Sequence, residues 1–123
     1  MYPINLVEYL TKKYDCTTTQ LIDILSDKQA NDDIIKHLQE QKLYVSFAQM
    51  TIRKIYPRFF TDKPTKDVNV LDEHSVVHDI SIKDFYKKYF RYDIKYLDLP
   101  CLEVNVYRIA SECIPLECII VWN

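Results

Sequence analysis

The sequence predicts an α+β domain in which helices come first and strands follow, with one helix inserted among the strands. Three observations support this: helical apolar spacing over residues 1–41, alternation that begins at residue 43, and one amphipathic stretch at 81–90. A chain of 123 residues is long enough for one modest core. We therefore expect a single domain, residues 1–123, built on a small barrel or curled sheet.

Residues 1–41 are predicted to form three helices. Asn5 followed by Glu8 is a capping-box pattern, threonines precede the second apolar stretch, and Asn31 is expected to cap the third helix. The segment carries four Lys and seven acidic residues, for a net charge of −3. We expect an acidic helical segment ahead of the strands.

Residues 42–66 and 92–123 are predicted to supply the strands. Leu43, Val45 and Phe47 alternate with polar residues, and Pro57 indicates an edge or a bend in the chain that follows. Phe59 and Phe60 are expected to be core or to pack under the hairpin. Beyond residue 91, "DIKYLDLP", "CLEVNVYRI" and "CIPLECIIVW" are all strand-like.

Residues 67–91 are predicted to form a hairpin followed by a helix. "VNVL" and "SVVHDI", joined by "DEH", give the hairpin, and Ser81 with Asp84 begins the helix with a capping-box pattern. The apolar residues of this helix fall on one face, at Ile82, Phe85, Tyr86, Tyr89 and Phe90. By spacing alone, at least half of the four rings should be core; we expect two to face the barrel and two to face a cleft.

The composition excludes several function classes. A chain with no glycine has neither a glycine-rich phosphate loop nor a G-x-S-x-G nucleophile elbow. Acid pairs, Cys–His pairs and Ser–His pairs in a recognisable context are lacking, so we expect no enzyme activity. His74 with His78 and Cys113 with Cys118 have poor zinc spacing, so we expect neither metal nor cofactor.

The four cysteines are predicted to be reduced thiols of an intracellular protein. The sequence has no apolar run of transmembrane length, and "MYPINLVEYL" lacks the pattern of a signal peptide. Unrelated cysteine spacings also give no disulfide framework. We expect Cys101 and Cys118 to be buried as small apolar side chains.

Charge is unevenly distributed although the net charge is only −2. Residues 42–66 carry six basic residues against one acid, net +5, and residues 81–96 carry five against two, net +3. Between them, residues 67–80 carry four acids and no Lys or Arg. Charge alone favours two solvated faces, but both basic blocks are also rich in aromatic residues, as in surfaces that bind nucleic acid.

Three stretches resemble the PAZ domain of Argonaute and Piwi proteins. "SIKDFYKKYFRYDIKYLDLPCLEV" followed by "CIPLECIIV" is similar to the family signature, and "QMTIRKIYPRFFTDKPTKD" resembles its basic strand. The resemblance covers nearly the whole chain. It implies an OB-like barrel from residues 42–66 and 92–123, a hairpin–helix clamp from 67–91, and a leading helical segment from 1–41.

The same resemblance implies a function in RNA silencing. In this family the 3′ end of a small single-stranded RNA, or the short 3′ overhang of a small duplex, lies between barrel and clamp. Slicing belongs to another domain. We therefore expect this domain to be a monomer when isolated, to be part of a larger Argonaute-like protein, and to have small RNA and the other Argonaute domains as partners, with no membrane.

Residues on the strands can be matched to the family one at a time. Arg53 lies where the family has a phosphate-binding Arg, and Ile114 where an apolar residue packs against the terminal sugar. Phe47 replaces a family His. Ile55 occupies the position of a family Tyr, with Tyr56 next to it. Val70 stands where the hairpin has its stacking aromatic residue.

Two registers remain open on the helix. One places Phe85 and Phe90 at two family tyrosines, and the other gives Lys88 and Tyr89 the expected polar roles. We hypothesise that Arg53, Tyr56, Lys88 and Tyr89 converge on a phosphate. Phe47 and a ring of Phe85 or Tyr86 would contact the terminal nucleotide.

Two functions are compatible with these residues. The basic and aromatic blocks favour an RNA 3′-end binding module. The substitutions at Phe47 and Val70, with the net acidity, favour a degenerate PAZ-like domain that serves as a protein-interaction scaffold with weak or no RNA binding.

Overall fold

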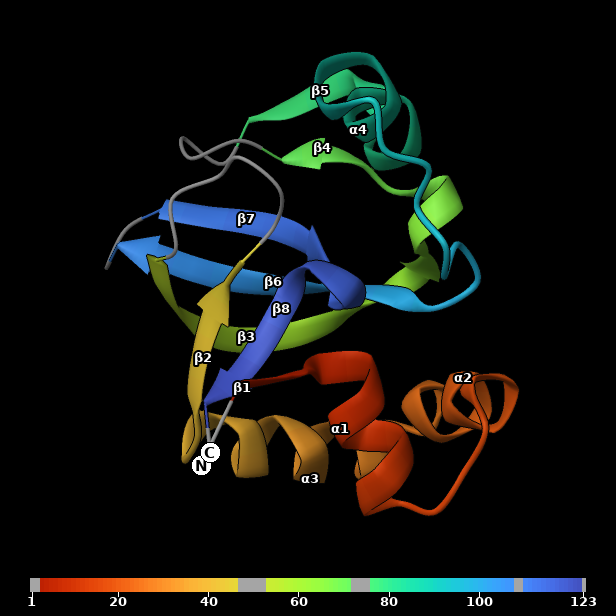
Figure 1. Ribbon diagram of the computed structural model, residues 1–123, viewed down its shortest axis with the longest axis vertical. Helices are drawn as coiled ribbons and strands as arrows, with labels where there is room; N and C mark the ends of the chain where they lie inside the picture. Colours follow the sequence, from red (N-terminus) through yellow and green to blue (C-terminus); the bar gives the residue numbers. More distant parts are fainter. Residues whose placement is uncertain (1–2, 47–52, 72–75, 108–109, 123) are drawn as a thin grey trace.

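The computed structural model describes the backbone of residues 3–46, 53–71, 76–107 and 110–122, and it shows three layers (Figure 1). Three helices from the start of the chain lie under a curled antiparallel sheet, and a hairpin with a fourth helix lies over the other side of the sheet. The predicted α+β class is confirmed. Within the described residues, none of the helices is both long and apolar enough to cross a bilayer.

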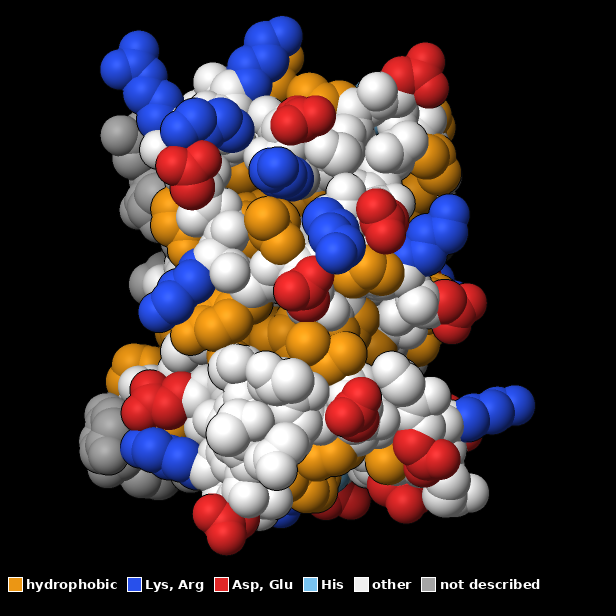
Figure 2. Space-filling model, turned by 90° about the vertical axis from the view of Figure 1, so that its right-hand side faces the viewer, with side chains coloured by type: hydrophobic (Ala, Val, Ile, Leu, Met, Phe, Trp, Pro, Cys, Tyr) orange, Lys and Arg blue, Asp and Glu red, His pale blue; other side chains and the backbone are white. Residues whose placement is uncertain are grey.

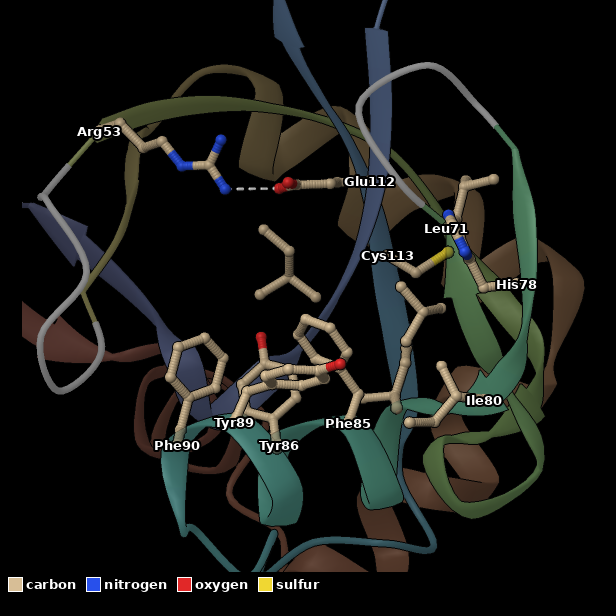
Figure 3. A pocket seen from close by; sticks show the side chains of 13 residues that line it. Arg53, Leu71, His78, Ile80, Phe85, Tyr86, Tyr89, Phe90, Glu112 and Cys113 are labelled. Atoms are coloured by element: carbon tan, nitrogen blue, oxygen red, sulfur yellow. Dashed lines mark hydrogen bonds and ion pairs between the residues drawn. The ribbon is translucent and has the colours of Figure 1, made fainter.

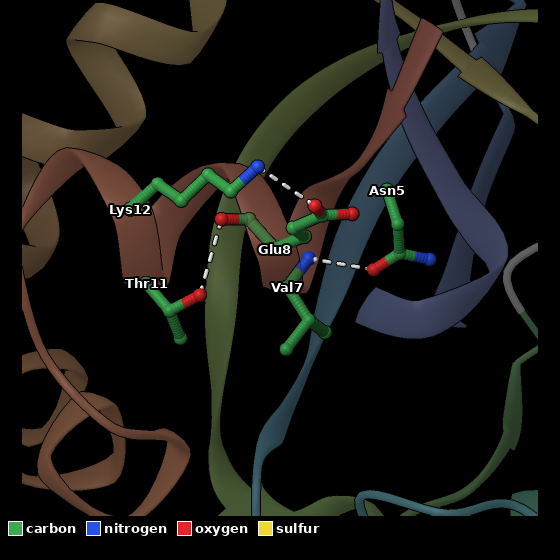
Figure 4. Close-up of polar contacts among 5 residues, drawn as sticks. All are labelled: Asn5, Val7, Glu8, Thr11 and Lys12. Atoms are coloured by element: carbon green, nitrogen blue, oxygen red, sulfur yellow. Dashed lines mark hydrogen bonds and ion pairs between the residues drawn. The ribbon is translucent and has the colours of Figure 1, made fainter.

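The first helix is α1, Leu6–Lys13, and Asn5 caps it as predicted. The Asn5 side chain accepts a hydrogen bond from the Val7 backbone N–H at 2.9 Å (Figure 4). The Glu8 carboxylate is engaged elsewhere, in an ion pair of 2.9 Å with Lys12 one turn along the helix. The local N-cap is therefore present, and Glu8 stabilises the helix surface instead of completing a capping box.

The next two helices follow almost without interruption as α2, Thr18–Ser26, and α3, Lys28–Gln39. Thr17 and Gln20 form a capping box at the start of α2. The prediction that Asn31 caps α3 is wrong, because Asp27 caps it by accepting from the Ala30 N–H at 2.9 Å. Asn31 lies inside the helix and donates to the Leu25 carbonyl at 3.0 Å, which ties α3 to α2.

The main sheet has six antiparallel strands in the order β1-β8-β2-β3-β6-β7. Their bounds are β1 Pro3–Asn5, β2 Lys42–Val45, β3 Arg53–Pro64, β6 Pro100–Tyr107, β7 Ala110–Pro115 and β8 Ile119–Trp122. In the described residues β1 and β7 remain edge strands, so the expected barrel is a curled, open sheet. The first three described residues pair with β8, which corrects the expectation that 1–41 is wholly helical.

The predicted strand "DIKYLDLP", residues 93–100, is wrong except at Pro100, where β6 begins. Helix α4, Ile82–Phe90, ends at Arg91 in the left-handed conformation with φ of 52°, and irregular chain follows until β6. The Glu117 carboxylate, from the short 3₁₀ helix Leu116–Cys118, accepts hydrogen bonds from the Tyr92 hydroxyl and from the backbone N–H of Tyr96 at 3.0 Å. A side-chain acceptor thus takes the place of a neighbouring strand.

The core is one buried cluster that joins side chains of the sheet to the three lower helices and to Ile82 and Tyr86 of α4. Leu43 and Val45 are fully buried, as their alternation predicted. Phe60 is buried, but Phe59 is 45% exposed, so the expectation that Phe59 is core is wrong. The pairing of β3 with β6 shifts register between Pro57 and Phe59, and this irregularity turns the Phe59 ring outward.

The upper layer consists of β4, Asn69–Leu71, β5, Val77–Ser81, and α4. A helix set between a hairpin and later strands was predicted and is confirmed. Ser81 caps α4 by accepting from the Asp84 N–H at 3.0 Å. The 3₁₀ helix Thr65–Asp67 leads into the hairpin, and the buried Thr65 hydroxyl donates to the Leu99 carbonyl at 2.7 Å. This bond joins the entry and exit of the upper layer.

The four cysteines are free thiols, and Cys101 and Cys118 are fully buried, as predicted. Figure 2 shows mainly acidic side chains over the helices below, in line with the net charge of −3 for residues 1–41. Most of the basic side chains in this view lie above the helices, interspersed with acidic ones.

Candidate functional site

A cavity of about 520 Å³ lies between the sheet and the hairpin–helix layer (Figure 3). Three walls enclose it: Arg53 with residues 112–114 of β7 on the sheet side, the hairpin, and the inward face of α4. We call this cavity the cleft. Its position between the two layers is where the sequence resemblance places a bound 3′ end.

The α4 wall of the cleft is aromatic. All four rings of the helix line it, and the exposed fraction rises from 7% for Tyr86 to 59% for Tyr89, with Phe85 and Phe90 half-buried. The rings contact one another, with centroids 4.8 Å apart for Phe85 and Tyr89 and 5.3 Å apart for Tyr86 and Phe90. The expected division into two rings that face the barrel and two that face the cleft is therefore wrong, because all four rings line the cleft as one continuous cluster.

Tyr86 connects the cleft to the core. Its burial raises the pKa of the phenol well above the ordinary value, and the neighbouring Cys118 and Cys101 act in the same direction. The hydroxyl is therefore neutral throughout the physiological range. The buried Tyr86 ring thus supports the rings of Phe85 and Phe90, which pack against it. The exposed Tyr89 ring is the part of this wall that a ligand can contact.

The sheet wall carries an ion pair that sequence reasoning missed. Arg53 Nη2 lies 2.6 Å from Glu112 Oε2, and the two side chains are 30% and 22% exposed (Figure 3). Ile114, predicted to face the cleft, lines it and is buried. Since alternate residues of a strand share a face, Ile114 also predicts that Glu112 points into the cleft. That signal was available in the sequence and unused.

The hairpin wall is mostly aliphatic. Val70, which stands at the family's stacking position, lines the cleft together with Leu71 and Ile80. His78 lies on the same wall. Its suggested metal partner, His74, lies outside the described residues, and the part of the chain that is described holds no group of three His, Cys, Asp or Glu side chains placed to bind a metal.

Two of the predicted phosphate contacts do not line the cleft. Tyr56 lies on the opposite face of β3 from the buried Ile55 and is 53% exposed, so the expectation that it converges with Arg53 is wrong. A separation of three residues along a strand places Arg53 and Tyr56 on opposite faces. Lys88 is exposed beside the rim, with its ammonium 5.2 Å from the centre of the Tyr89 ring. Phe47 lies outside the described residues.

The described residues give the cleft an apolar, aromatic interior and a sheet wall on which Arg53 is paired with Glu112. The cleft can enclose a ring or a sugar against Tyr89, Phe85 and Ile114. Arg53 can hold an anion if the Glu112 carboxylate shares the guanidinium or moves away. Cys113 lines the same space, and burial, aided by Glu103 and Glu112, raises the pKa of its thiol to about 11.

Three solved structures resemble this chain over nearly its whole length, each at 16% identity. The PAZ domain of Drosophila Argonaute2, described for its structure and nucleic-acid binding, has a TM-score of 0.70 and covers 98% of this chain and 99% of its own. The Drosophila Ago-PAZ domain in complex with RNA that is 2′-O-methylated at its 3′ end has a TM-score of 0.71, with coverage of 99% and 100%. An Argonaute 2 PAZ structure on 3′-end recognition of nucleic acids has a TM-score of 0.63, with coverage of 98% and 94%.

No family model matches the sequence, and no curated protein matches it. The structural likeness extends to both ends of the chain and includes the hairpin–helix layer, so the chain has the PAZ fold. The fold that the sequence resemblance implied is confirmed.

Proposed function

We propose that this domain anchors the 3′ end of a small single-stranded RNA, or the short 3′ overhang of a small RNA duplex, in the cleft. The observation that carries the proposal is the aromatic cavity between the sheet and the hairpin–helix layer. It is supported by the PAZ fold, since two of the similar structures are described in terms of nucleic-acid 3′ ends.

The terminal nucleotide is held by rings. Tyr89 and Phe85 stack on the terminal base or sugar, while Phe90 and Tyr86 support them from the core side and Ile114 packs beneath the sugar. Stacking of this kind tolerates any base, because every base has a π face. Binding is therefore independent of sequence.

The phosphate is held by polar groups on both sides of the cleft. Arg53 supplies the cation on the sheet wall, and Lys88 with the Tyr89 hydroxyl supplies contacts from the α4 rim. The contact of Phe47 with the terminal nucleotide stays a prediction from the resemblance. Charge-assisted contacts to phosphate position the strand and read no bases.

Two features of the cleft lower its expected affinity for RNA. Val70 offers an aliphatic contact where an aromatic ring would contribute about 1–3 kcal/mol per stacked base. The Arg53 guanidinium already forms an ion pair with the Glu112 carboxylate, with which a phosphate must compete. This ion pair is the observation that favours the second candidate function, a scaffold that binds other proteins and little or no RNA.

The proposal includes a cellular setting. The domain binds and does not catalyse, and it acts inside the cell as one module of a larger Argonaute-like protein, monomeric when isolated. Four free thiols support an intracellular setting, because cytosolic proteins keep their cysteines reduced.

The test is a titration of the purified domain with a short single-stranded RNA in three forms: a free 3′ hydroxyl, a 3′ phosphate, and a closed circle. We expect the free end to bind best, with weak salt dependence because few phosphates are contacted. Arg53→Ala should weaken the free-end complex by about 1–3 kcal/mol. Lys36→Ala, the same charge change on exposed α3, is the matched control.

Equal affinity of the wild type for all three RNAs would mean that the basic residues bind backbone without recognising an end. Absence of binding to all three would contradict the RNA proposal and favour the scaffold function instead.

A further inference from the structure

The outward face of the sheet carries a second cluster of rings and cations, on the side of β3 away from the cleft. We call it the outer platform and define it by the residues Lys42, Lys54, Tyr56, Arg58, Phe59 and Trp122. Five of these side chains alternate along their strands with buried residues such as Leu43, Ile55 and Val121, and Phe59 is turned outward by the register shift in β3. Because the buried set faces the core, the platform set faces outward.

The strand register brings the platform residues together from three strands. Trp122 of β8 lies directly opposite Lys42 of β2, and Lys54 of β3 lies opposite Tyr44 of β2. The β2–β3 register, continued by one residue beyond the pair Leu43 and Ile55, sets Tyr56 beside Lys42. Trp122, Lys42 and Tyr56 thus form a row across three strands, and the two rings lie on the order of 10 Å apart, two strand spacings.

The platform rings are open to a partner. Trp122, Tyr56 and Phe59 have exposed fractions of 46%, 53% and 45%. Each β3 ring lies close to a cation: Lys54 Nζ is 5.4 Å from the centre of the Tyr56 ring, and Arg58 Cζ is 5.6 Å from that of Phe59. Single exposed rings are ordinary, but three on one sheet face with interleaved cations form an amphipathic surface.

The charge of the platform distinguishes it from the cleft. Lys42 and Lys54 take part in no ion pair within the residues that the structure describes, and Arg58 has one partner, Glu103, at 3.3 Å with nearly half of its own side chain exposed. In the cleft, by contrast, Arg53 is paired with Glu112 at 2.6 Å. Among the described residues, the platform therefore retains net positive charge, whereas the charge of Arg53 in the cleft is balanced by Glu112.

A hollow of about 520 Å³ adjoins the platform, and its lining adds amide groups. Lys54, Tyr56, Arg58 and Phe59 line it together with Gln39, Gln41 and Asn105, and the Gln39 amide donates to the Pro57 carbonyl at 3.4 Å. Amide side chains supply both hydrogen-bond donors and acceptors, which suits the edges and sugars of unpaired nucleotides.

We propose that the outer platform binds single-stranded RNA, at a site separate from the cleft and without a requirement for a 3′ end. Unpaired bases stack on Tyr56, Phe59 and Trp122, and Lys42 and Lys54 contact the phosphates between them. The strand must be single, because bases paired in a duplex cannot stack on protein rings.

The two unpaired lysines also argue against a protein as the occupant. The centres of protein–protein interfaces are depleted of lysine, because an unpaired ammonium is costly to bury. On a phosphate backbone, by contrast, each lysine releases a counterion and adds to affinity.

The test uses a circular single-stranded RNA of about 15 nucleotides, which has no end for the cleft. The wild-type domain should bind it at low salt. The double variant Lys42→Gln/Lys54→Gln should bind several-fold more weakly, and its slope of log affinity against log salt should fall by about 1.4, the value for two lost contacts to a single strand. Tyr56→Ala should weaken binding about tenfold, as expected for one lost stack.

Two controls make the result specific. Lys28→Gln/Lys36→Gln carries the same charge change on exposed positions of α3 and should leave the affinity and the salt slope unchanged. A three-nucleotide RNA with a free 3′ end is short enough to be held mainly in the cleft, so the platform variants should bind it nearly as the wild type does. This arm separates failure of the platform from failure of the cleft.

The platform proposal is overturned if the wild type shows no affinity for the circle at low salt. It is equally overturned if the platform variants bind the circle as well as the wild type and the α3 control do. Unchanged thermal melting of Tyr56→Ala, an exposed position, confirms that a loss of binding comes from the platform surface.

Discussion

Replacing Glu112 with glutamine should tighten RNA binding to the cleft. The change keeps the size and shape of the side chain and removes its charge. The glutamine carbonyl can still accept a hydrogen bond from Arg53, so the wall of the cleft should keep its geometry. In the wild type, an incoming phosphate must share the Arg53 guanidinium with the carboxylate that lies 2.6 Å from it, or displace that carboxylate.

The magnitude follows from the bond that must be given up. A hydrogen bond to a charged partner contributes about 1.5–3 kcal/mol. Both side chains keep some exposure, 30% for Arg53 and 22% for Glu112, so water replaces part of the lost contact. We therefore expect a gain near the lower limit, about 1.5 kcal/mol, which corresponds to roughly tenfold in Kd.

The assay is a double-mutant cycle read by fluorescence anisotropy with a three-nucleotide RNA that has a free 3′ end. The four proteins are the wild type, Glu112→Gln, Arg53→Ala and the double variant. If Glu112 acts by pairing with Arg53, Glu112→Gln should change the Kd by less than about threefold in the Arg53→Ala background. Only the screened repulsion between the Glu112 carboxylate and the phosphate is then lost. Glu8→Gln, another acid from an ion pair but on α1, is the matched control.

Two results would refute the reasoning. One is an unchanged or weaker affinity of Glu112→Gln when its thermal melting matches that of the wild type. The other is an equal gain in the presence and absence of Arg53, which would show that Glu112 repels RNA without competing for the arginine.

Three further predictions concern single side chains. Tyr89→Phe should weaken binding of the free 3′ end by about 0.5–1.5 kcal/mol, since only a hydroxyl is lost; an unchanged Kd would remove that hydroxyl from the phosphate site. Glu117→Ala should lower the free energy of unfolding in urea by about 2 kcal/mol, because the Tyr92 hydroxyl and backbone N–H groups lose their acceptor; an effect below about 0.5 kcal/mol would contradict this. Burial raises the pKa of the Cys101 thiol to about 12 and that of Cys113 to about 11, so the folded state favours both neutral thiols. The stability that comes from keeping these thiols neutral is complete below the ordinary thiol pKa and is lost as pH rises from about 9 towards 11–12. The free energy of unfolding should therefore fall over that pH range, and it should fall less steeply for Cys113→Ala than for the wild type.

Local signals predicted the elements of the upper layer well. Ser81 and Asp84 marked the start of α4, and the spacing of its rings placed them on one face. Both signals act within one or two helical turns, so no distant residue is needed to interpret them. The same applies to Leu43 and Val45, whose alternation fixed which side of β2 is buried.

Strand-like composition was a poorer guide where a distant acceptor satisfies the backbone. Residues 93–99 have the composition of a strand, but the Glu117 carboxylate accepts hydrogen bonds from the backbone N–H groups of Lys95 and Tyr96. Asn31 looked like a helix cap, yet Asp27 already filled that role one turn earlier. In both cases a competing hydrogen-bond partner decided the outcome.

The sequence by itself determined the α+β class, the cap and apolar face of α4, the burial of Cys101 and Cys118, and, through its resemblance to the PAZ family, the fold. Only the tertiary structure decided that Arg53 is paired with Glu112, 59 positions away, and that Lys42, Tyr56 and Trp122 meet on one outer face. The physical reason is register. Periodicity sets which face of a strand a residue occupies, whereas its neighbours on other strands depend on how the whole core packs.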